Sequence, residues 1–109
     1  MASHSADARE LAEIRRLASD PACVAWTETA RYDAQGRGLS KQDITAEIVK
    51  WIDRAERVKR VTLRGQHAGM TAYELKPRIN SILFYIKLTL CDLSQPDESL
   101  LIISAHPDH

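Results

Sequence analysis

Three side chains able to transfer protons lie toward the carboxyl end of the 109-residue sequence. Tyr85 and Lys87 alternate with apolar residues in the stretch 82–90, and His106 follows the apolar stretch 100–105. Side chains two positions apart on a strand point to the same face, so Tyr85 and Lys87 should share a face. Histidine has an unperturbed pKa of about 6.5 and can therefore accept or donate a proton near neutral pH.

Such a group beside cations is suited to the cleavage of RNA without a metal ion. A base takes the proton of a ribose 2′-OH, the 2′-oxygen attacks the adjacent phosphorus, and an acid protonates the leaving 5′-oxygen, which yields a 2′,3′-cyclic phosphate. Lys59, Arg60 and Arg64 would stabilise the charge on the phosphorane. Nearby cations are expected to lower the pKa of Tyr85. Whether His106 or Tyr85 is the base stays open.

The charge of the chain is unevenly distributed, although 15 Lys and Arg balance 15 Asp and Glu. Residues 54–78 hold seven basic and two acidic residues, whereas residues 92–109 hold four acidic residues and neither Lys nor Arg. Because salt screens surface charges over roughly 10 Å, the basic segment can attract a polyanion in a neutral protein. The alternative is a set of solvated charges that protect an edge strand. The expected RNA- and phosphate-binding residues are Arg60, Arg64, Lys76, Arg78 and Lys87.

The residues before position 54 are predicted to form helices. Apolar side chains recur there every three or four positions, as on the buried face of a helix. Thr27 and the pair Ser40 and Asp43 are typical of helix starts, and Gly36 and Gly38 are typical of helix ends. The expected helices cover residues 6–18, 28–35 and 41–52.

From residue 57 onward the apolar period changes to two, which indicates strands. In residues 82–90 the even-numbered side chains are all apolar and should face the core, while the odd-numbered ones, with Tyr85 and Lys87, face the other way. Turns are expected at 65–69 and 77–80, and a loop at 94–99. The expected strands cover residues 58–64, 70–76, 82–90 and 100–105.

Helices followed by strands predict an α+β fold, and a chain of this length has room for one hydrophobic core. We therefore expect a single domain, 1–109, in which the mainly helical residues 1–53 pack on one face of an antiparallel sheet formed by residues 54–109. Trp26 and Trp51 are assigned to the core, although an exposed tryptophan could stack on a base.

Several functional classes are not expected from the composition and motifs. No apolar run exceeds five residues, against roughly 20 for a membrane-spanning helix, and residues 1–10 lack the apolar stretch of a signal peptide. A cytoplasmic protein without a membrane partner is therefore expected. The sequence has no glycine-rich phosphate loop and no metal-ligand motif, and its two cysteines, Cys23 and Cys91, are far apart. Neither a metal nor a nucleotide cofactor is expected.

Parts of the sequence resemble a known family, the MqsR-type toxins. The family has a Pro-Arg-apolar segment, a Tyr-apolar-Lys strand and a terminal apolar strand that ends in Ser-x-Lys/His. The corresponding segments of this chain are Pro77-Arg78-Ile79, Phe84-Tyr85-Ile86-Lys87-Leu88 and Leu101-Ile102-Ile103-Ser104-Ala105-His106. Thr29-Ala30, Gly38-Leu39 and the helix through Ile44 and Ile48 are similar to the helical half of the family, so the resemblance covers residues 26–106.

The resemblance implies a RelE-like microbial ribonuclease fold and sequence-selective cleavage of single-stranded messenger RNA. It also implies the toxin of a type II toxin–antitoxin pair, an mRNA interferase that inhibits translation and growth and is neutralised by a cognate antitoxin protein. By position, Lys59 matches the basic residue that follows the third helix of the family, Tyr85 the strand tyrosine, and His106 the residue at the end of the last strand. These three are the expected catalytic residues. The family also has a glutamine in the second strand, which residues 71–74 lack, so its contribution is either missing or supplied by Tyr73 or Gln66.

Two other functions remain open at this point. The first is a non-catalytic RNA- or protein-binding module that uses the same basic sheet face. The second is a small structural protein whose basic strand contacts the acidic residues 92–109 of a second copy.

Overall fold

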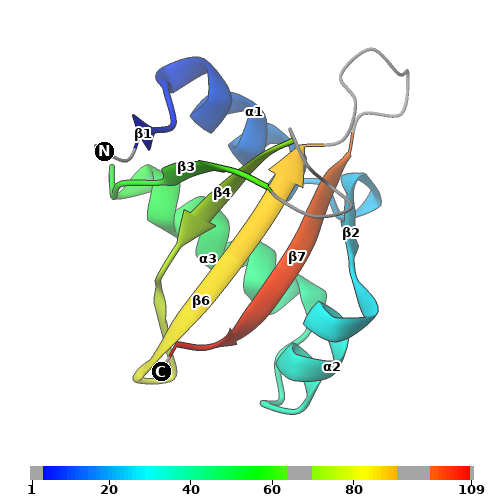
Figure 1. Ribbon diagram of the computed structural model, residues 1–109. Coiled ribbons are helices and arrows are strands. Elements are labelled where there is room, and N and C mark those ends of the chain that lie inside the picture. The colour runs from blue at the N-terminus through cyan, green and yellow to red at the C-terminus, as the bar shows by residue number, and fades with distance from the viewer. Residues whose placement is uncertain (1–3, 64–69, 91–98, 109) are drawn as a thin grey trace.

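A mixed β-sheet with helices on one side forms the body of the chain (Figure 1). The computed structural model describes residues 4–63, 70–90 and 99–108. The helices are α1 (Ala8–Ala18), a short 3₁₀-helix (Pro21–Cys23), α2 (Glu28–Gln35) and α3 (Lys41–Asp53). The strands are β1 (His4–Ser5), β2 (Val24–Trp26), β3 (Lys59–Thr62), β4 (Thr71–Leu75), β5 (Arg78–Ile79), β6 (Ile82–Leu90) and β7 (Leu100–Pro107).

Local capping residues set where each helix begins. Asp7 accepts a hydrogen bond from the backbone N–H of Glu10, so α1 begins two residues later than predicted. Thr27 caps α2 and Ser40 caps α3 with the capping box that the sequence predicts. None of the helices in the described ranges is both long and apolar enough to cross a membrane.

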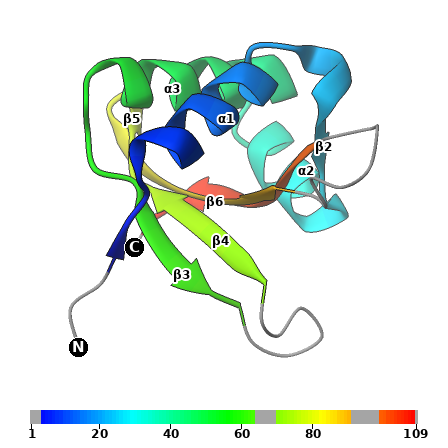
Figure 2. The same cartoon turned by 90° about the horizontal axis from the view of Figure 1, so that it is seen from above.

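The helices lie on one side of a curved sheet (Figure 2). In this view α1 and α3 run over one face, while β3 and β4 bend away from them. The core lies between these two layers, and full burial of one large apolar side chain stabilises the fold by roughly 1.5–3 kcal/mol. Its largest fully buried side chains are Ile14, Leu17, Ile44, Ile48, Leu75, Phe84, Ile86, Leu88, Leu100 and Ile102.

The order of strands in the sheet is β1-β3-β4-β6-β7-β2, and β5 pairs with β6. The prediction of a wholly antiparallel sheet is wrong at one edge, because β2 runs parallel to β7 with Val24 opposite Leu100. A parallel pair needs a long connection. Here 73 residues separate the end of β2 from the start of β7 and include α2 and α3, which makes this pairing possible.

The predicted strands are present, and all of them except β6 have shifted ends. β6 has the predicted bounds, whereas β7 continues to Pro107, so His106 lies inside the strand rather than beyond it. β5 occupies part of the predicted turn at 77–80. The turn predicted at 65–69 lies outside the described residues, as does most of the loop predicted at 94–99.

A β-bulge in β7 ties α2 to the sheet. The register shifts between Lys87 and Leu88, which pair with Ser104 and Ile102, so Ile103 is the extra residue. The carbonyl oxygen of Ile103 accepts a hydrogen bond of 3.0 Å from the hydroxyl of Thr27, and this same hydroxyl accepts one from the backbone N–H of Ala30 inside α2. The start of α2 is therefore fixed to the irregular part of β7.

Two isoleucines of β6 provide a matched test of this packing. Ile86 is 0% exposed and Ile82 is 40% exposed, so Ile86→Ala should lower the free energy of unfolding by about 2–5 kcal/mol and Ile82→Ala by less than about 1 kcal/mol. Urea unfolding of both variants measures the difference. The prediction that every even-numbered residue of β6 faces the core is wrong at Ile82, and equal losses of stability would contradict this difference between the two side chains.

Candidate functional site

Polar side chains gather on the sheet face that points away from α1 and α3, called here the outer face. The backbone register places Lys59 opposite Glu74 and Glu74 opposite Lys87, across β3, β4 and β6. On the next strand pair, Tyr85 of β6 lies opposite His106 of β7. These five residues are called the outer-face cluster.

Tyr85 and His106 are direct cross-strand neighbours. Their ring centroids are 5.4 Å apart, with the planes tilted by 38°. The Nζ of Lys87 lies 5.7 Å from the centroid of the Tyr85 ring, within the range of a cation–π contact. The two candidate proton-transfer groups therefore lie on the same face, beside a cation.

A contact with the backbone favours one tautomer of the neutral His106 ring. Its Nδ1 lies 2.9 Å from the carbonyl oxygen of Pro107. A carbonyl oxygen only accepts hydrogen bonds, so this contact favours a proton on Nδ1. In the neutral ring Nε2 is then the acceptor, which is the atom a general base needs.

Glu74 also belongs to the candidate site, although it is not among the site residues expected from the sequence. Its side chain is only 17% exposed and accepts a hydrogen bond from the Tyr85 hydroxyl. The Nζ atoms of Lys59 and Lys87 lie 3.9 Å and 3.8 Å from its carboxylate oxygens. The sequence contains a signal for it, because Glu74 stands between Tyr73 and Leu75, and strand alternation places its side chain on the face opposite to theirs.

Burial and Glu74 together raise the pKa of Tyr85 well above its usual value of 10. Loss of hydration contributes most, followed by the hydrogen bond to Glu74, the charge of Glu74 and the charge of Asp108. The expectation that cations lower this pKa is therefore wrong, because a carboxylate rather than a lysine contacts the hydroxyl. At neutral pH the phenol keeps its proton and is suited to be an acid.

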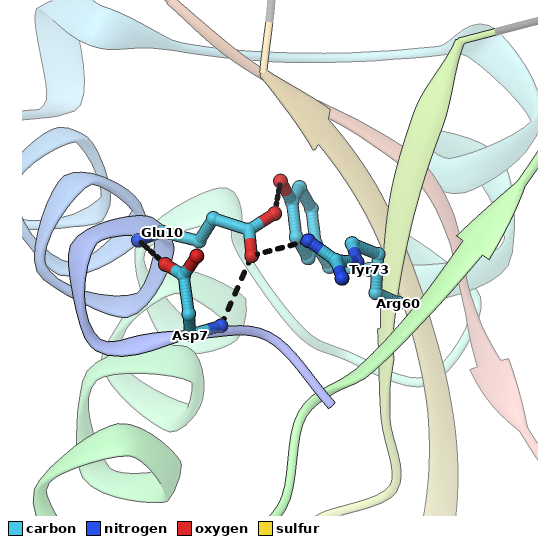
Figure 3. A network of polar contacts seen from close by, with 4 residues as sticks. All are labelled: Asp7, Glu10, Arg60 and Tyr73. Atoms are coloured by element: carbon cyan, nitrogen blue, oxygen red, sulfur yellow. Dashed lines mark hydrogen bonds and ion pairs between the residues drawn. The ribbon is translucent and has the colours of Figure 1, made fainter. Parts of the chain in front are cut away.

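Arg60, one of the predicted phosphate-binding residues, lies on the other face (Figure 3). Its Nη1 is 2.9 Å from a carboxylate oxygen of Glu10 in α1, and the Tyr73 hydroxyl donates to the same carboxylate. Burial and this hydrogen bond raise the pKa of Tyr73 as well. Arg60 is thus part of a contact between α1 and the sheet and is not brought together with Tyr85.

The other predicted phosphate-binding residues have different positions. Lys87 belongs to the outer-face cluster. Lys76 follows β4, and its Nζ lies 3.3 Å from a carboxylate oxygen of Asp108. Arg78 is exposed on β5 and lines a hollow at the carboxyl end of α3 together with Lys76. Arg64 lies outside the described residues.

A pocket of about 350 Å³ adjoins the outer-face cluster. It lies between the carboxyl end of α3 and the strands β3, β4 and β6. Trp51, Arg57, Lys59, Glu74, Lys76 and Tyr85 are among its lining residues. The cluster is therefore open to a ligand of moderate size on this side.

Comparison with known proteins leaves the function to be argued from this geometry. No family model, no curated protein and no solved structure matches the chain. Across the residues that the structure describes, no three His, Cys, Asp or Glu side chains are grouped so that they could hold a metal ion.

The raised pKa of Tyr85 leads to a prediction for Glu74→Gln. Removal of the carboxylate charge next to the phenol should lower the pKa of Tyr85, although burial should still keep it above 10. Glu10→Gln is the matched control, because it should lower the pKa of Tyr73 and leave that of Tyr85 unchanged. NMR titration of ¹³C-labelled tyrosine rings measures both values.

The same shifts set the sign of the pH dependence of stability. The folded chain holds the protons of Tyr73 and Tyr85 more tightly than the unfolded chain, in which tyrosine has a pKa of about 10. The free energy of unfolding should therefore fall as the pH rises above about 10.

The outcome of the Glu74→Gln titration also tests the contact itself. A Tyr85 pKa that does not respond to Glu74→Gln would show that the two side chains do not interact in solution.

Proposed function

We propose that the chain is a metal-independent endoribonuclease that cleaves single-stranded messenger RNA. The observation that carries the proposal is the outer-face cluster, in which a histidine, a protonated tyrosine and two lysines are adjacent on one face of a sheet. An acid, a base and cations are the groups that transfer of a phosphoryl group to a ribose 2′-OH requires.

The geometry suggests a role for each proton-transfer group. His106 Nε2 takes the proton of the 2′-OH, and the 2′-oxygen forms a bond to phosphorus. The bond from phosphorus to the 5′-oxygen breaks, and that oxygen takes the phenolic proton of Tyr85. The products are a 2′,3′-cyclic phosphate and a free 5′-OH. Return of the proton from His106 to Tyr85, whose ring lies 5.4 Å away, restores the starting state.

The lysines act on the phosphate. Lys59 and Lys87 are both held within 4 Å of Glu74, so two positive charges border one small region of the sheet. The charge that develops on the phosphorane oxygens would be stabilised there by Coulomb attraction. Glu74 holds these lysines and the Tyr85 hydroxyl in position, and it yields part of its contacts when a phosphate binds.

The biological role proposed is that of the toxin of a toxin–antitoxin pair. Its support is the resemblance of residues 26–106 to MqsR-type toxins, together with an α+β arrangement that is compatible with a RelE-like ribonuclease fold. Cleavage of messenger RNA would inhibit translation in the cytoplasm, and a cognate antitoxin protein would neutralise the chain.

One observation favours a second candidate, a non-catalytic RNA- or protein-binding module on the same face. Each lysine of the outer-face cluster already has a carboxylate partner in Glu74, as in a surface that only balances its charges. Such a module would not depend on proton transfer by His106 or Tyr85.

Incubation of the purified chain with RNA in EDTA distinguishes the two candidates. The nuclease should release 2′,3′-cyclic phosphate ends, and Tyr85→Phe and His106→Ala should each slow cleavage by about 10²–10⁴-fold. Tyr32→Phe is the control, because Tyr32 is 78% exposed on α2, away from the outer-face cluster. This variant should cleave RNA as fast as the unaltered chain. Binding without cleavage would support the module, and cleavage of a substrate with 2′-deoxyribose at the scissile position would contradict the mechanism.

The toxin role makes a separate prediction in cells. Expression of the chain in bacteria should arrest growth, since translation fails when messenger RNA is cut. Tyr85→Phe should relieve the arrest at equal protein level, whereas Tyr32→Phe should not. Growth rate and immunoblots of the two variants provide the measurement, and an equal arrest by both variants would exclude cleavage through Tyr85 as its cause.

A further inference from the structure

We infer that the pocket beside Trp51 binds a nucleobase of the RNA next to the cleaved phosphate. The inference rests on the proposed function and adds a binding subsite to it. The pocket volume of about 350 Å³ is within the range of roughly 300–1,000 Å³ that is typical of small-molecule sites. Lys59, Glu74 and Tyr85 belong both to the pocket and to the outer-face cluster, so a base in the pocket leaves its phosphate at the cluster.

Trp51 has the position and the fixed orientation of a stacking residue. It lies in the last turn and a half of α3, is half-buried, and packs against the core. Its indole N–H donates a hydrogen bond of 3.0 Å to the carbonyl oxygen of Arg57, so the polar group of the ring is already satisfied within the chain. What the ring offers the pocket is its aromatic surface, on which any base can stack.

The other lining residues complement a nucleotide. Leu75 is 2% exposed and supplies an apolar wall for the flat base. Lys59 and Lys76 are also lining residues, and their positive charges would attract the negatively charged RNA backbone. The Glu74 oxygen near Lys59 lies 3.9 Å from Nζ, which is beyond hydrogen-bond distance, and so can accept a hydrogen bond from an N–H of the base.

A fluorescence experiment tests this subsite without relying on cleavage. Trp26→Phe leaves Trp51 as the only tryptophan, and a 2′-O-methyl RNA oligomer binds without being cut because its 2′-oxygens carry no proton. This oligomer should quench Trp51 fluorescence saturably. An oligomer of the same length with abasic riboses should not, since it lacks the group that stacks. Equal quenching by both oligomers, or by neither, would overturn the inference.

Substitution of Trp51 provides the second arm. Trp51→Leu keeps an apolar side chain but removes the stack, so it should weaken binding of the 2′-O-methyl oligomer by about five- to 150-fold. In cleavage the same variant should raise KM with little change in kcat, because the outer-face cluster is intact. Trp51→Phe, which retains a ring, should restore most of the binding, and this result separates stacking from packing. Unchanged binding in a folded Trp51→Leu chain would contradict the subsite.

The two proposals can fail independently in these measurements. Base-dependent quenching without any cleavage of RNA would leave the subsite in place and remove the nuclease function. Cleavage through Tyr85 and His106, with unchanged KM in Trp51→Leu and no base-dependent quenching, would leave the nuclease and remove the subsite.

Discussion

The alternation of β6 is the constraint on which both the core and the candidate site depend. β6 lies between β4 and β7, and its side chains point in turn to the helices and to the outer face. Phe84, Ile86 and Leu88 are buried against the helices, which fixes Tyr85 and Lys87 on the other side. A slip of one residue would expose the apolar set, so the hydrophobic effect that stabilises the core also determines where the polar residues stand.

Glu74 gives the outer-face cluster its electrostatic character. It lies on β4 between Lys59 of β3 and Lys87 of β6, and pairs of opposite charge on neighbouring strands stabilise a sheet. With it, the folded chain holds both lysines and a phenol around one carboxylate before any ligand arrives. A bound phosphate must compete with this carboxylate, so binding strength and stability of the sheet are linked through one side chain.

The features that the sequence predicts well are those with local causes. α2 has the predicted bounds because Thr27 caps it and Gly36 ends it, and β6 has them because nine residues alternate without interruption. The parallel pairing of β2 with β7 was missed because its partners lie more than 70 residues apart and β2 is a three-residue apolar stretch with no pattern of its own.

The candidate site was predicted in part for the same reason. Tyr85, Lys87 and His106 come together as expected, since each belongs to a long strand with a clear apolar face. Lys59 and Arg60 are consecutive residues of a short strand, and both are charged, so no local pattern shows which one faces the helices. That choice depends on the pairing of Arg60 with Tyr73 and on Glu10, which is 50 residues away in the chain.

The parallel edge of the sheet also affects how the molecule is assembled on the ribosome. β7 is synthesised after every other described element, yet it lies between β6 and β2. Until β7 emerges, β2 has no neighbouring strand, and one long edge of β6 has unpaired backbone groups. The nascent chain therefore carries its helices and most of its strands as an unfinished sheet, and His106 enters the structure in the same step that closes it.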